Sequence, residues 1–259
     1  MAAVKSITSR DNPLLARLRK LGADPGAYRK LGEVWLEGDH LCEAFLRRGG
    51  AAAQAVVTEA AWESPRLREL ASRAASVAIV PPSLMESVST LESAPPLGFV
   101  VPWAGPGTVA AGEATVVLDR LQDAGNVGTI LRSAAAFGFG QVVALKGTAA
   151  LWSPKVLRAG MGAHFGLKLV EGATDVGALG VPLVATSSHA AQAIDEAALP
   201  WPCAWVLGHE GQGVESSLLE RCALALRIPQ PGGEESLNVA SAAAVCLYES
   251  ARQRRVRGR

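Results

Sequence analysis

An asparagine and an arginine stand close together in a loop that follows a predicted strand at residues 115–119. The loop contains Asn126 and Gly128 and runs into a predicted helix at 126–138 that carries Arg132. Small residues one helical turn before and after Arg132 leave space around its guanidinium. A guanidinium in such a place can bind a phosphate through two parallel hydrogen bonds. Taken alone, this loop fits a surface or salt-bridged arginine equally well.

A second loop, at residues 208–213, follows a predicted strand at 204–207 and has three glycines among its six residues. Glycines at these positions expose backbone amides and carbonyls to a ligand. Glu210 is the only carboxylate of this turn, and three roles are open to it. It can cap the helix that follows, hold Arg132, or accept a proton from a substrate.

A third polar loop follows a predicted strand at 224–228 and leads into a helix of small residues at 238–254. Ser236 and Asn238 are residue types that cap helices, and capping is the simplest role for each of them. The alanines of the helix allow it to pack closely on another element or on the same helix of a second copy.

Strands and helices alternate around these loops, which predicts a mainly parallel sheet covered on both faces. Ligands of such sheets bind beyond the carboxyl ends of the strands. Three loops at one such edge would form one concave site. The predicted strands are 115–119, 141–145, 183–186, 204–207 and 224–228, and the predicted helices are 126–138, 153–161, 214–221 and 238–254.

A proline- and glycine-rich stretch at residues 92–113 separates this region from the first part of the chain. We therefore predict one domain at 1–104, a linker at 105–112 and a second domain at 113–259.

The first domain is expected to be a small α/β structure. Asn12 and Pro13 can start a helix, because the leucines that follow them have a helical period. The apolar positions of this helix are Leu14, Leu15, Leu18 and Leu21, and the other predicted elements are strands at 34–36, 55–58, 77–80 and 99–101 and a helix at 38–48.

The composition excludes several classes of protein. Hydrophobic residues make up 49% and charged residues 19% of the chain, which argues against a disordered or fibrous protein. No apolar run approaches the roughly 20 residues of a membrane span, and no apolar signal core is present, so neither membrane insertion nor export is expected. Four scattered cysteines fit the reducing cytoplasm, and four dispersed histidines predict no metal site.

The charge is unevenly distributed along the chain. Residues 1–31 carry seven basic and two acidic residues, a net charge of +5, and residues 252–259 carry five arginines and no acid. The 220 residues between them carry 13 basic and 22 acidic residues, a net charge of −9. Basic ends often contact nucleic acid, although solvated charge is the better explanation for the tail alone.

Taken together, these segments resemble the SPOUT superfamily and, within it, the SpoU-type RNA 2′-O-ribose methyltransferases. The resemblance extends from residue 115 to residue 252 and rests on the order and spacing of three motifs. The motifs are Asn126-x-Gly128-x-x-x-Arg132-Ser, Leu207-Gly-x-Glu210-Gly-x-Gly213, and Ile228-Pro229 followed by Ser236-Leu-Asn238-Val. The N-terminal part resembles, less closely, a ribosomal-protein-like RNA-binding domain that is often fused to these enzymes.

The resemblance implies an α/β protein with a trefoil-knotted C-terminal SPOUT domain and a smaller N-terminal RNA-binding domain. It also implies S-adenosylmethionine as the cofactor, no metal, and a homodimer with the active site at its interface. The cofactor contacts carried over by the motifs are backbone groups at Gly208, Ile228 and Leu237, with Thr186, Leu207, Gly211 and Gly213 nearby. The chain departs from the family at His209 and at Ala124-Gly125, which bears on the substrate more than on the reaction.

The implied activity is S-adenosylmethionine-dependent methylation of a ribose 2′-hydroxyl in rRNA or tRNA, in the cytoplasm. Arg132 is the first candidate for catalysis. Because an arginine pKa lies above about 12, it is a poor base. We expect it to bind the adjacent phosphate and to stabilise the developing alkoxide, with Glu210 orienting it or accepting the proton. The other expected catalytic residues are Asn126, Ser236 and Asn238, and the expected RNA contacts are Asn12, Arg29, Lys155 and Arg158.

Other functions are weighed against this one. The main alternative is a non-catalytic RNA-binding or ribosome assembly factor that retains the fold, but the presence of Asn126, Arg132 and Glu210 favours an enzyme. A nicotinamide-dependent oxidoreductase would carry its glycine fingerprint at the first strand–helix turn, where this chain has none. A base methyltransferase of the same superfamily fits these loops less well.

Overall fold

The computed structural model describes residues 3–232 and 236–257, and the chain divides into two compact units. The first unit contains the chain up to Gly105 together with Trp152–Phe165. The second contains Pro106–Leu151 and the chain from Gly166 onwards. Trp152–Phe165, which we placed in the C-terminal domain from its position in the sequence, therefore packs as part of the first unit.

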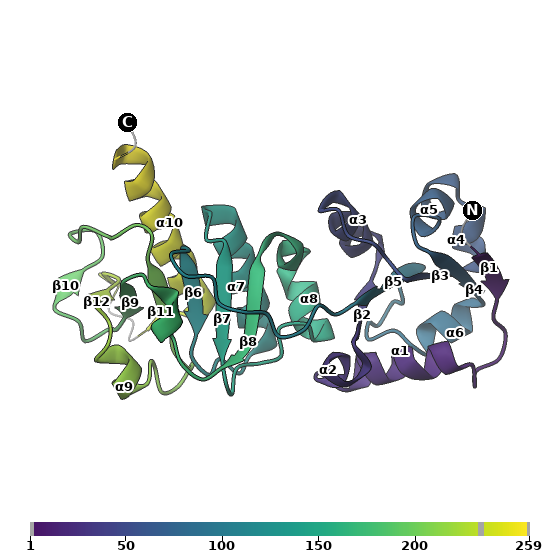
Figure 1. Ribbon diagram of the computed structural model, residues 1–259, viewed down its shortest axis with the longest axis horizontal. Helices are drawn as coiled ribbons and strands as arrows, with labels where there is room; N and C mark the ends of the chain where they lie inside the picture. Colours follow the sequence, from purple (N-terminus) through teal and green to yellow (C-terminus); the bar gives the residue numbers. More distant parts are fainter. Residues whose placement is uncertain (1–2, 233–235, 258–259) are drawn as a thin grey trace. The chain divides into compact units, whose positions relative to one another are not determined.

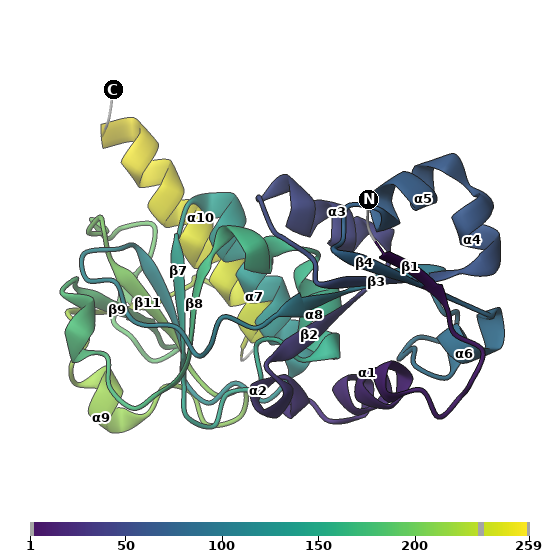
Figure 2. The same cartoon turned by 45° about the vertical axis from the view of Figure 1, so that its right-hand side comes forward.

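The first unit contains a mixed sheet. Its strands are β1 (Ala3–Ser6), β2 (Glu33–Glu37), β3 (Gln54–Thr58), β4 (Ser76–Val80) and β5 (Leu97–Pro102). Its helices are α1 (Pro13–Ala23), α2 (Ala27–Leu31), α3 (Asp39–Arg47), α4 (Glu59–Glu63), α5 (Pro65–Ala71), α6 (Pro82–Glu86) and α8 (Pro154–Gly160). The strand order is β1-β4-β3-β5-β2, and β5 runs antiparallel to both of its neighbours (Figure 1). Figure 2 shows α1 and α6 on one side of this sheet and α3, α4 and α5 on the other.

The helix predicted after Asn12 is confirmed as α1. The Asn12 side chain accepts a hydrogen bond of 2.9 Å from the Leu14 amide, Pro13 is the first helical residue, and the four expected leucines are buried. The predicted strands correspond to β2, β3, β4 and β5. Strand β1 was not predicted, because its four residues are all exposed and lack an apolar alternation. The short helices α2, α4, α5 and α6 were also missed.

The second unit contains a seven-stranded sheet that is parallel throughout, in the order β10-β12-β9-β11-β6-β7-β8. Its strands are β6 (Thr115–Leu118), β7 (Gln141–Leu145), β8 (Lys168–Ala173), β9 (Leu183–Thr186), β10 (Gln192–Ala193), β11 (Ala204–Leu207) and β12 (Leu224–Arg227). Its helices are α7 (Ala124–Phe137), α9 (Ser216–Leu219) and α10 (Val239–Arg257), with a 3-10 turn η2 (Gly177–Leu179), and the 3-10 turn η1 (Ala163–Gly166) spans the division between the units.

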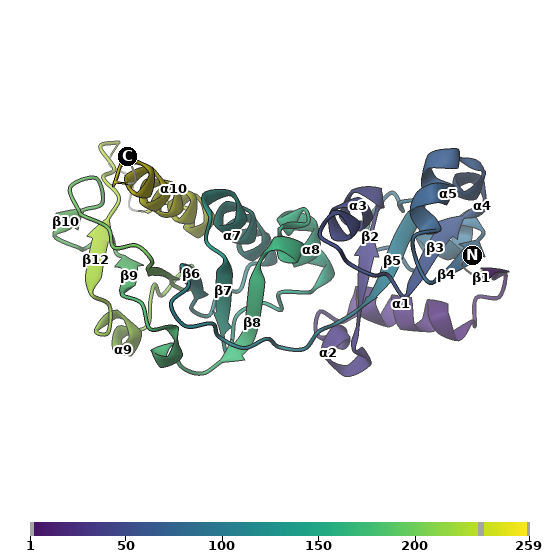
Figure 3. The same ribbon diagram turned by 45° about the horizontal axis from the view of Figure 1, so that its top comes forward.

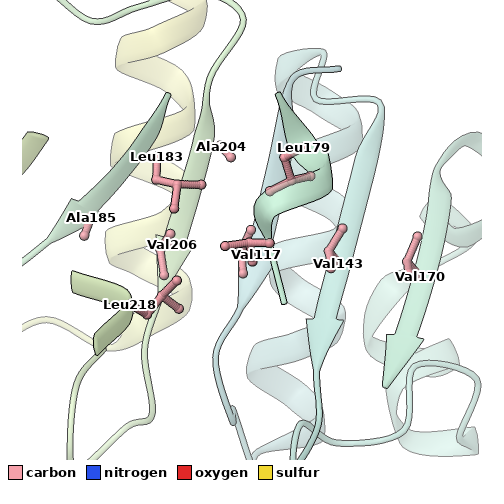
Figure 4. Close-up of a cluster of buried hydrophobic side chains, with 10 residues drawn as sticks. Val117, Val143, Val170, Leu179, Leu183, Ala185, Ala204, Val206 and Leu218 are labelled. Carbon is pink, nitrogen blue, oxygen red and sulfur yellow. The ribbon is translucent and has the colours of Figure 1, made fainter. Parts of the chain in front are cut away.

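Both faces of the parallel sheet are covered, as the alternation of strands and helices predicts. Val117, Val143 and Val206 point toward one face, where Leu179 of η2 and Leu218 of α9 pack over them (Figure 4). Figure 3 shows α7 and α10 side by side along the other face. There the buried indole of Trp205 on β11 donates a hydrogen bond of 2.8 Å to Ser250 of α10.

Several predicted boundaries in this unit were wrong. We expected Asn126 to cap a helix starting there, but α7 begins at Ala124 because the Asp123 side chain accepts a 2.6 Å bond from the Asn126 amide. The helix expected at 214–221 is reduced to α9. Strands β8 and β10, which lie at the two ends of the sheet, were missed because β10 has only two residues and the apolar residues of β8, Leu169 and Val170, make too short a run to indicate a strand. Within the described residues, no helix is long and apolar enough to cross a membrane.

Candidate active site

Four neighbouring parallel strands place their following loops at one edge of the second sheet. Strands β12, β9, β11 and β6 are adjacent in that order, and Leu118 of β6 is paired with Leu207 of β11. Leu226 of β12 is paired with Thr186 at the end of β9. Because all four strands run the same way, the three polar loops leave the sheet on the same side.

A chain of side-chain hydrogen bonds joins these three loops. The Asn126 side-chain amide donates to Glu210 Oε1 over 3.3 Å, and the Asn238 side-chain amide donates to Asn126 Oδ1 over 3.0 Å. The same Glu210 carboxylate accepts the backbone amides of Gln122 and Asp123 over 3.2 and 3.1 Å. Residues from the first, second and third motifs therefore meet at one place. Asn238 also caps α10 through the Ala240 and Ser241 amides, as predicted.

Glu210 is held as an ionised acceptor. Partial burial raises the pKa of Glu210, but hydrogen bonds from the backbone amides of Glu210, Gln122 and Asp123 and from Asn126 outweigh it, so the pKa lies below its usual value. A carboxylate with a lowered pKa is a weaker base. The arrangement therefore suits Glu210 to fixing the first loop more than to accepting a proton.

We expect the ionisation of Glu210 to leave the pH dependence of methyl transfer unaffected near neutrality. The folded pKa is depressed, so the carboxylate's contribution is complete above its unfolded pKa and is lost only as the pH falls through the lower folded value. Profiles of kcat/KM for the wild type and Glu210→Gln should thus be parallel above about pH 5.5. A limb near neutral pH that is present only in the wild type would identify Glu210 as the base instead.

Asp119 and Arg120 form a second link between the loops, which sequence reasoning missed. The Asp119 carboxylate, whose side chain is 1% exposed, accepts Arg120 Nε over 2.8 Å, Arg120 Nη2 over 3.0 Å and the Glu215 amide over 2.8 Å. Burial raises the pKa of Asp119, but these hydrogen bonds outweigh it and keep the pKa below its ordinary value. Arg120 also contacts Gln212 Oε1 over 3.3 Å. The φ of Arg120 is 59°, which places a non-glycine residue in the left-handed region. This backbone conformation is unfavourable, and the surrounding hydrogen bonds must offset its cost.

The glycine loop after β11 folds back tightly on itself. The Gly213 amide donates to the His209 carbonyl over 2.8 Å, and the Gly211 amide donates to His209 Nδ1 over 3.0 Å. A Cβ atom on Gly208 would lie 2.1 Å from the Gly213 carbonyl carbon and the Val214 nitrogen. Gly208 is therefore required by this close backbone approach, whatever ligand the loop holds.

The residues expected to bind the cofactor lie around the same strand ends. Thr186 and Leu207 end β9 and β11, and Ile228 directly follows β12. Among the described residues, no protein group accepts a hydrogen bond from the backbone amides of Gly208, Ile228 and Leu237. Donors without a protein acceptor fit a ligand that is held mainly through backbone groups, as the resemblance implies for S-adenosylmethionine.

Two of the expected catalytic residues make no hydrogen bond to Asn126, Glu210 or Asn238 among the described residues. Arg132 is exposed on α7, and within the described ranges no carboxylate lies in ion-pair range of its guanidinium, so Glu210 does not hold it in this chain. Ser236 is exposed beside Leu237, whose side chain is 41% exposed.

The expected RNA contacts all belong to the first unit. Asn12 caps α1, so it has a structural role whatever else it does. The Arg29 guanidinium lies 5.0 Å from the centre of the Tyr28 ring. Lys155 and Arg158 are exposed on α8 and separated by three positions, which places them on one helix face.

The cysteines offer no thiolate for chemistry near neutral pH. Burial raises the pKa of Cys203 to about 12 and that of Cys222 to about 11, and it also raises the pKa of Cys42 and of Cys246. No group of three or more His, Cys, Asp and Glu side chains in the described part of the chain could hold a metal ion.

Known proteins resemble this chain in sequence and in fold. The model of the SpoU rRNA methylase family matches residues 113–248. An uncharacterized tRNA/rRNA methyltransferase from Synechocystis sp. is 35% identical over 266 residues, which cover 96% of this chain and 94% of that protein. A crystal structure of an AdoMet-bound rRNA methyltransferase from Sinorhizobium meliloti superposes with a TM-score of 0.84 at 25% identity, covering 96% of this chain and 98% of that one.

A further relative matches about half of this chain. RlmP from Bacillus subtilis, named a 23S rRNA (guanosine(2553)-2′-O)-methyltransferase, is 36% identical over 145 residues, which cover 54% of this chain and 58% of that enzyme. The fold and the joined loops define an RNA methyltransferase that depends on S-adenosylmethionine. The chain belongs to the SpoU rRNA methylase family.

Proposed function

We propose that this protein transfers the methyl group of S-adenosylmethionine to a ribose 2′-hydroxyl of rRNA or tRNA, in the cytoplasm where those substrates lie. The observation that carries the proposal is the contact of Asn126, Glu210 and Asn238, which joins the three family motifs beside the strand ends. The name of RlmP, which specifies 2′-O-methylation of 23S rRNA, supports the ribose as the acceptor.

The cofactor would be held by the backbone amides at Gly208, Ile228 and Leu237, with Thr186 and Leu207 beside them. When bound, S-adenosylmethionine supplies a methyl carbon that is already electrophilic. The protein then has to position the ribose oxygen and to favour the loss of its proton.

Arg132 is proposed to bind the phosphate next to the methylated ribose and to stabilise the developing alkoxide. Its exposure and the small residues around it on α7 leave the guanidinium open to a ligand. Glu210, Asn126 and Asn238 keep the first loop, and with it the start of α7, in place. Ser236 is proposed to reach the substrate from the third loop.

We propose a homodimer in which α7 and α10 face the second copy and a trefoil knot in the second unit, both implied by the family resemblance. Leu237, Val245 and Tyr248 are large apolar side chains that are 41%, 40% and 48% exposed in the single chain. Covering them with a second copy would remove apolar surface from water and enclose Arg132. Light scattering of the purified protein should give twice the monomer mass.

We propose that the first unit binds the RNA. It carries 14 basic and 11 acidic side chains, whereas the second unit carries 11 basic and 13 acidic ones. Arg29, Lys155 and Arg158 are its candidate phosphate contacts.

RNA affinity should fall steeply with salt, because each phosphate contact releases counterions. Each lost contact lowers the slope of log K against log salt by about 0.7 to 0.9. The double variant Lys155→Ala and Arg158→Ala should therefore reduce the slope by about 1.5 in filter-binding titrations. Lys168→Ala in the second unit is the control. Equal slopes for the wild type and the double variant would remove α8 from the RNA interface.

The proposed function is tested by incubating the protein with labelled S-adenosylmethionine and total cellular RNA from cells that lack it, followed by mapping of 2′-O-methyl positions. We expect one or a few modified riboses in rRNA or tRNA. Label on a base would contradict the ribose assignment. A thermal shift with S-adenosylmethionine and no transfer to any RNA would indicate a binding protein that retains the fold.

A further inference from the structure

The first unit contains a cavity of about 260 Å³ that the methyl-transfer site does not use. Its apolar wall includes Trp35 of β2, Leu41 of α3, Leu91 and, from α8, Leu157. A cavity of this size that is mostly apolar with a few polar groups is typical of a binding site for a small flat ligand or part of a larger one.

Two of the polar side chains that line this cavity are carboxylates that are fixed in position. Glu37 accepts the Thr90 amide over 3.1 Å and the Thr90 hydroxyl over 2.8 Å. Asp39 pairs with Arg66, and this hydrogen bond holds the pKa of Asp39 below its ordinary value. Each carboxylate has about four acceptor positions, so both keep capacity for another donor.

The lining also includes a buried aromatic residue, the imidazole of His40 and an exposed cation. Trp35 is buried, with a relative exposure of 3%. Its indole Nε1 has no hydrogen-bond partner among the described residues. A buried polar group without a partner is uncommon and points to a missing one. Arg158 of α8 also lines the cavity, and it is one of the exposed cations expected to contact RNA.

This combination of groups selects a nucleobase over a phosphate. Two fixed carboxylates repel a phosphate, but they accept hydrogen bonds from an exocyclic amino group, as acidic side chains do from cytosine. The apolar and aromatic wall suits the flat face of a base, and Arg158 is available for the backbone beside it. Unstacked bases held in this way are the usual means by which proteins recognise specific RNA loops.

We propose that the cavity lined by Trp35, Glu37, Asp39 and Leu91 binds one unstacked base of the substrate RNA, a base that carries an amino group. The inference rests on the proposed function, since it identifies a second point at which the same RNA is recognised. Adenine, guanine or cytosine fits the two acceptors, and uracil, which has no amino group, fits them less well.

Filling the cavity tests this site. Leu91→Trp places an indole where the base would lie and should raise the KM for total cellular RNA by about 5- to 150-fold, the range of a lost base-stacking contact. The KM for S-adenosylmethionine should not change. The matched control is Leu67→Trp, at a half-buried leucine of α5 that does not line the cavity, and it should leave both values unchanged.

Ultraviolet cross-linking of the wild-type protein to total cellular RNA provides a second measurement that needs no variant. After nuclease and protease digestion, we expect adducts of adenosine, guanosine or cytidine on peptides that contain Trp35 or Leu91. Uridine adducts alone, no adduct on these peptides, or an unchanged KM for RNA in Leu91→Trp would overturn the proposal. If only the base site is wrong, the wild-type protein still methylates a ribose of the RNA. If the proposed function is wrong, no ribose is labelled, so the two failures can be told apart.

Discussion

Arg132→Ala should reduce kcat for RNA methylation by about 100- to 1,000-fold, the usual effect of removing one donor that stabilises charge in the transition state. The guanidinium is exposed on α7 and makes no ion pair within the described residues, so its removal breaks no contact that holds the fold. Binding of S-adenosylmethionine, measured by thermal shift or calorimetry, should be unchanged. Single-turnover kinetics with saturating RNA would measure the chemical step directly.

Arg221→Ala is the matched control for this experiment. Arg221 is also an exposed arginine of the second unit, and its partner is Asp175, at 2.7 Å. The control should retain wild-type kcat. If Arg132→Ala kept normal methyl transfer while binding the cofactor, Arg132 would not be the catalytic residue, and the role of α7 in the reaction would have to be reassigned.

Asp119→Ala should destabilise the second unit by about 3 kcal/mol, the lower end of the range for breaking a buried ion pair. The cost stays at this end because the Arg120 side chain is 31% exposed and can reach water. The substitution removes three hydrogen bonds from one carboxylate and leaves Arg120 in a left-handed conformation without its partner. Denaturant unfolding followed by the intrinsic fluorescence of the tryptophans, among them the buried Trp205, measures the loss. The affinity for S-adenosylmethionine should fall with it, because Asp119 holds the Glu215 amide at the end of the glycine loop.

Asp175→Ala provides the comparison for Asp119→Ala. Asp175 also pairs with an arginine of the second unit, but the Asp175 and Arg221 side chains are 59% and 48% exposed. An exposed pair of this kind contributes about 0–1 kcal/mol. If the two variants had equal unfolding free energies, the Asp119–Arg120 link would not stabilise the loops.

The local pattern of the chain was sufficient for most of the elements. The leucines after Asn12 predicted α1 and its buried face, and the apolar runs predicted β6, β7, β9, β11 and β12 with small errors at their ends. Elements with few apolar residues were missed, such as the exposed β1 and the edge strand β8, which has an apolar run of only two residues. These are held by pairing with a neighbouring strand, which no local pattern records.

The candidate site was predicted as a set of residues, and its internal contacts were not. Asn126, Glu210 and Asn238 were named from their motifs, but the direction of their hydrogen bonds was not foreseen. We expected Glu210 to meet Arg132, and instead it accepts the Gln122 and Asp123 amides. No sequence motif predicted the link through Asp119 and Arg120, because a single acidic residue at the end of a strand is common.

The sequence by itself therefore determined which elements form, their order along the chain and which loops carry polar residues. These features depend on residues that are close to one another in the sequence. The tertiary structure decided which loops meet. Asn126 contacts residues 84 and 112 positions away, which is possible because the non-sequential order of the parallel strands places the ends of β6, β11 and β12 at one edge. Strand order is set by the packing of the whole unit, so it cannot be read from any single segment.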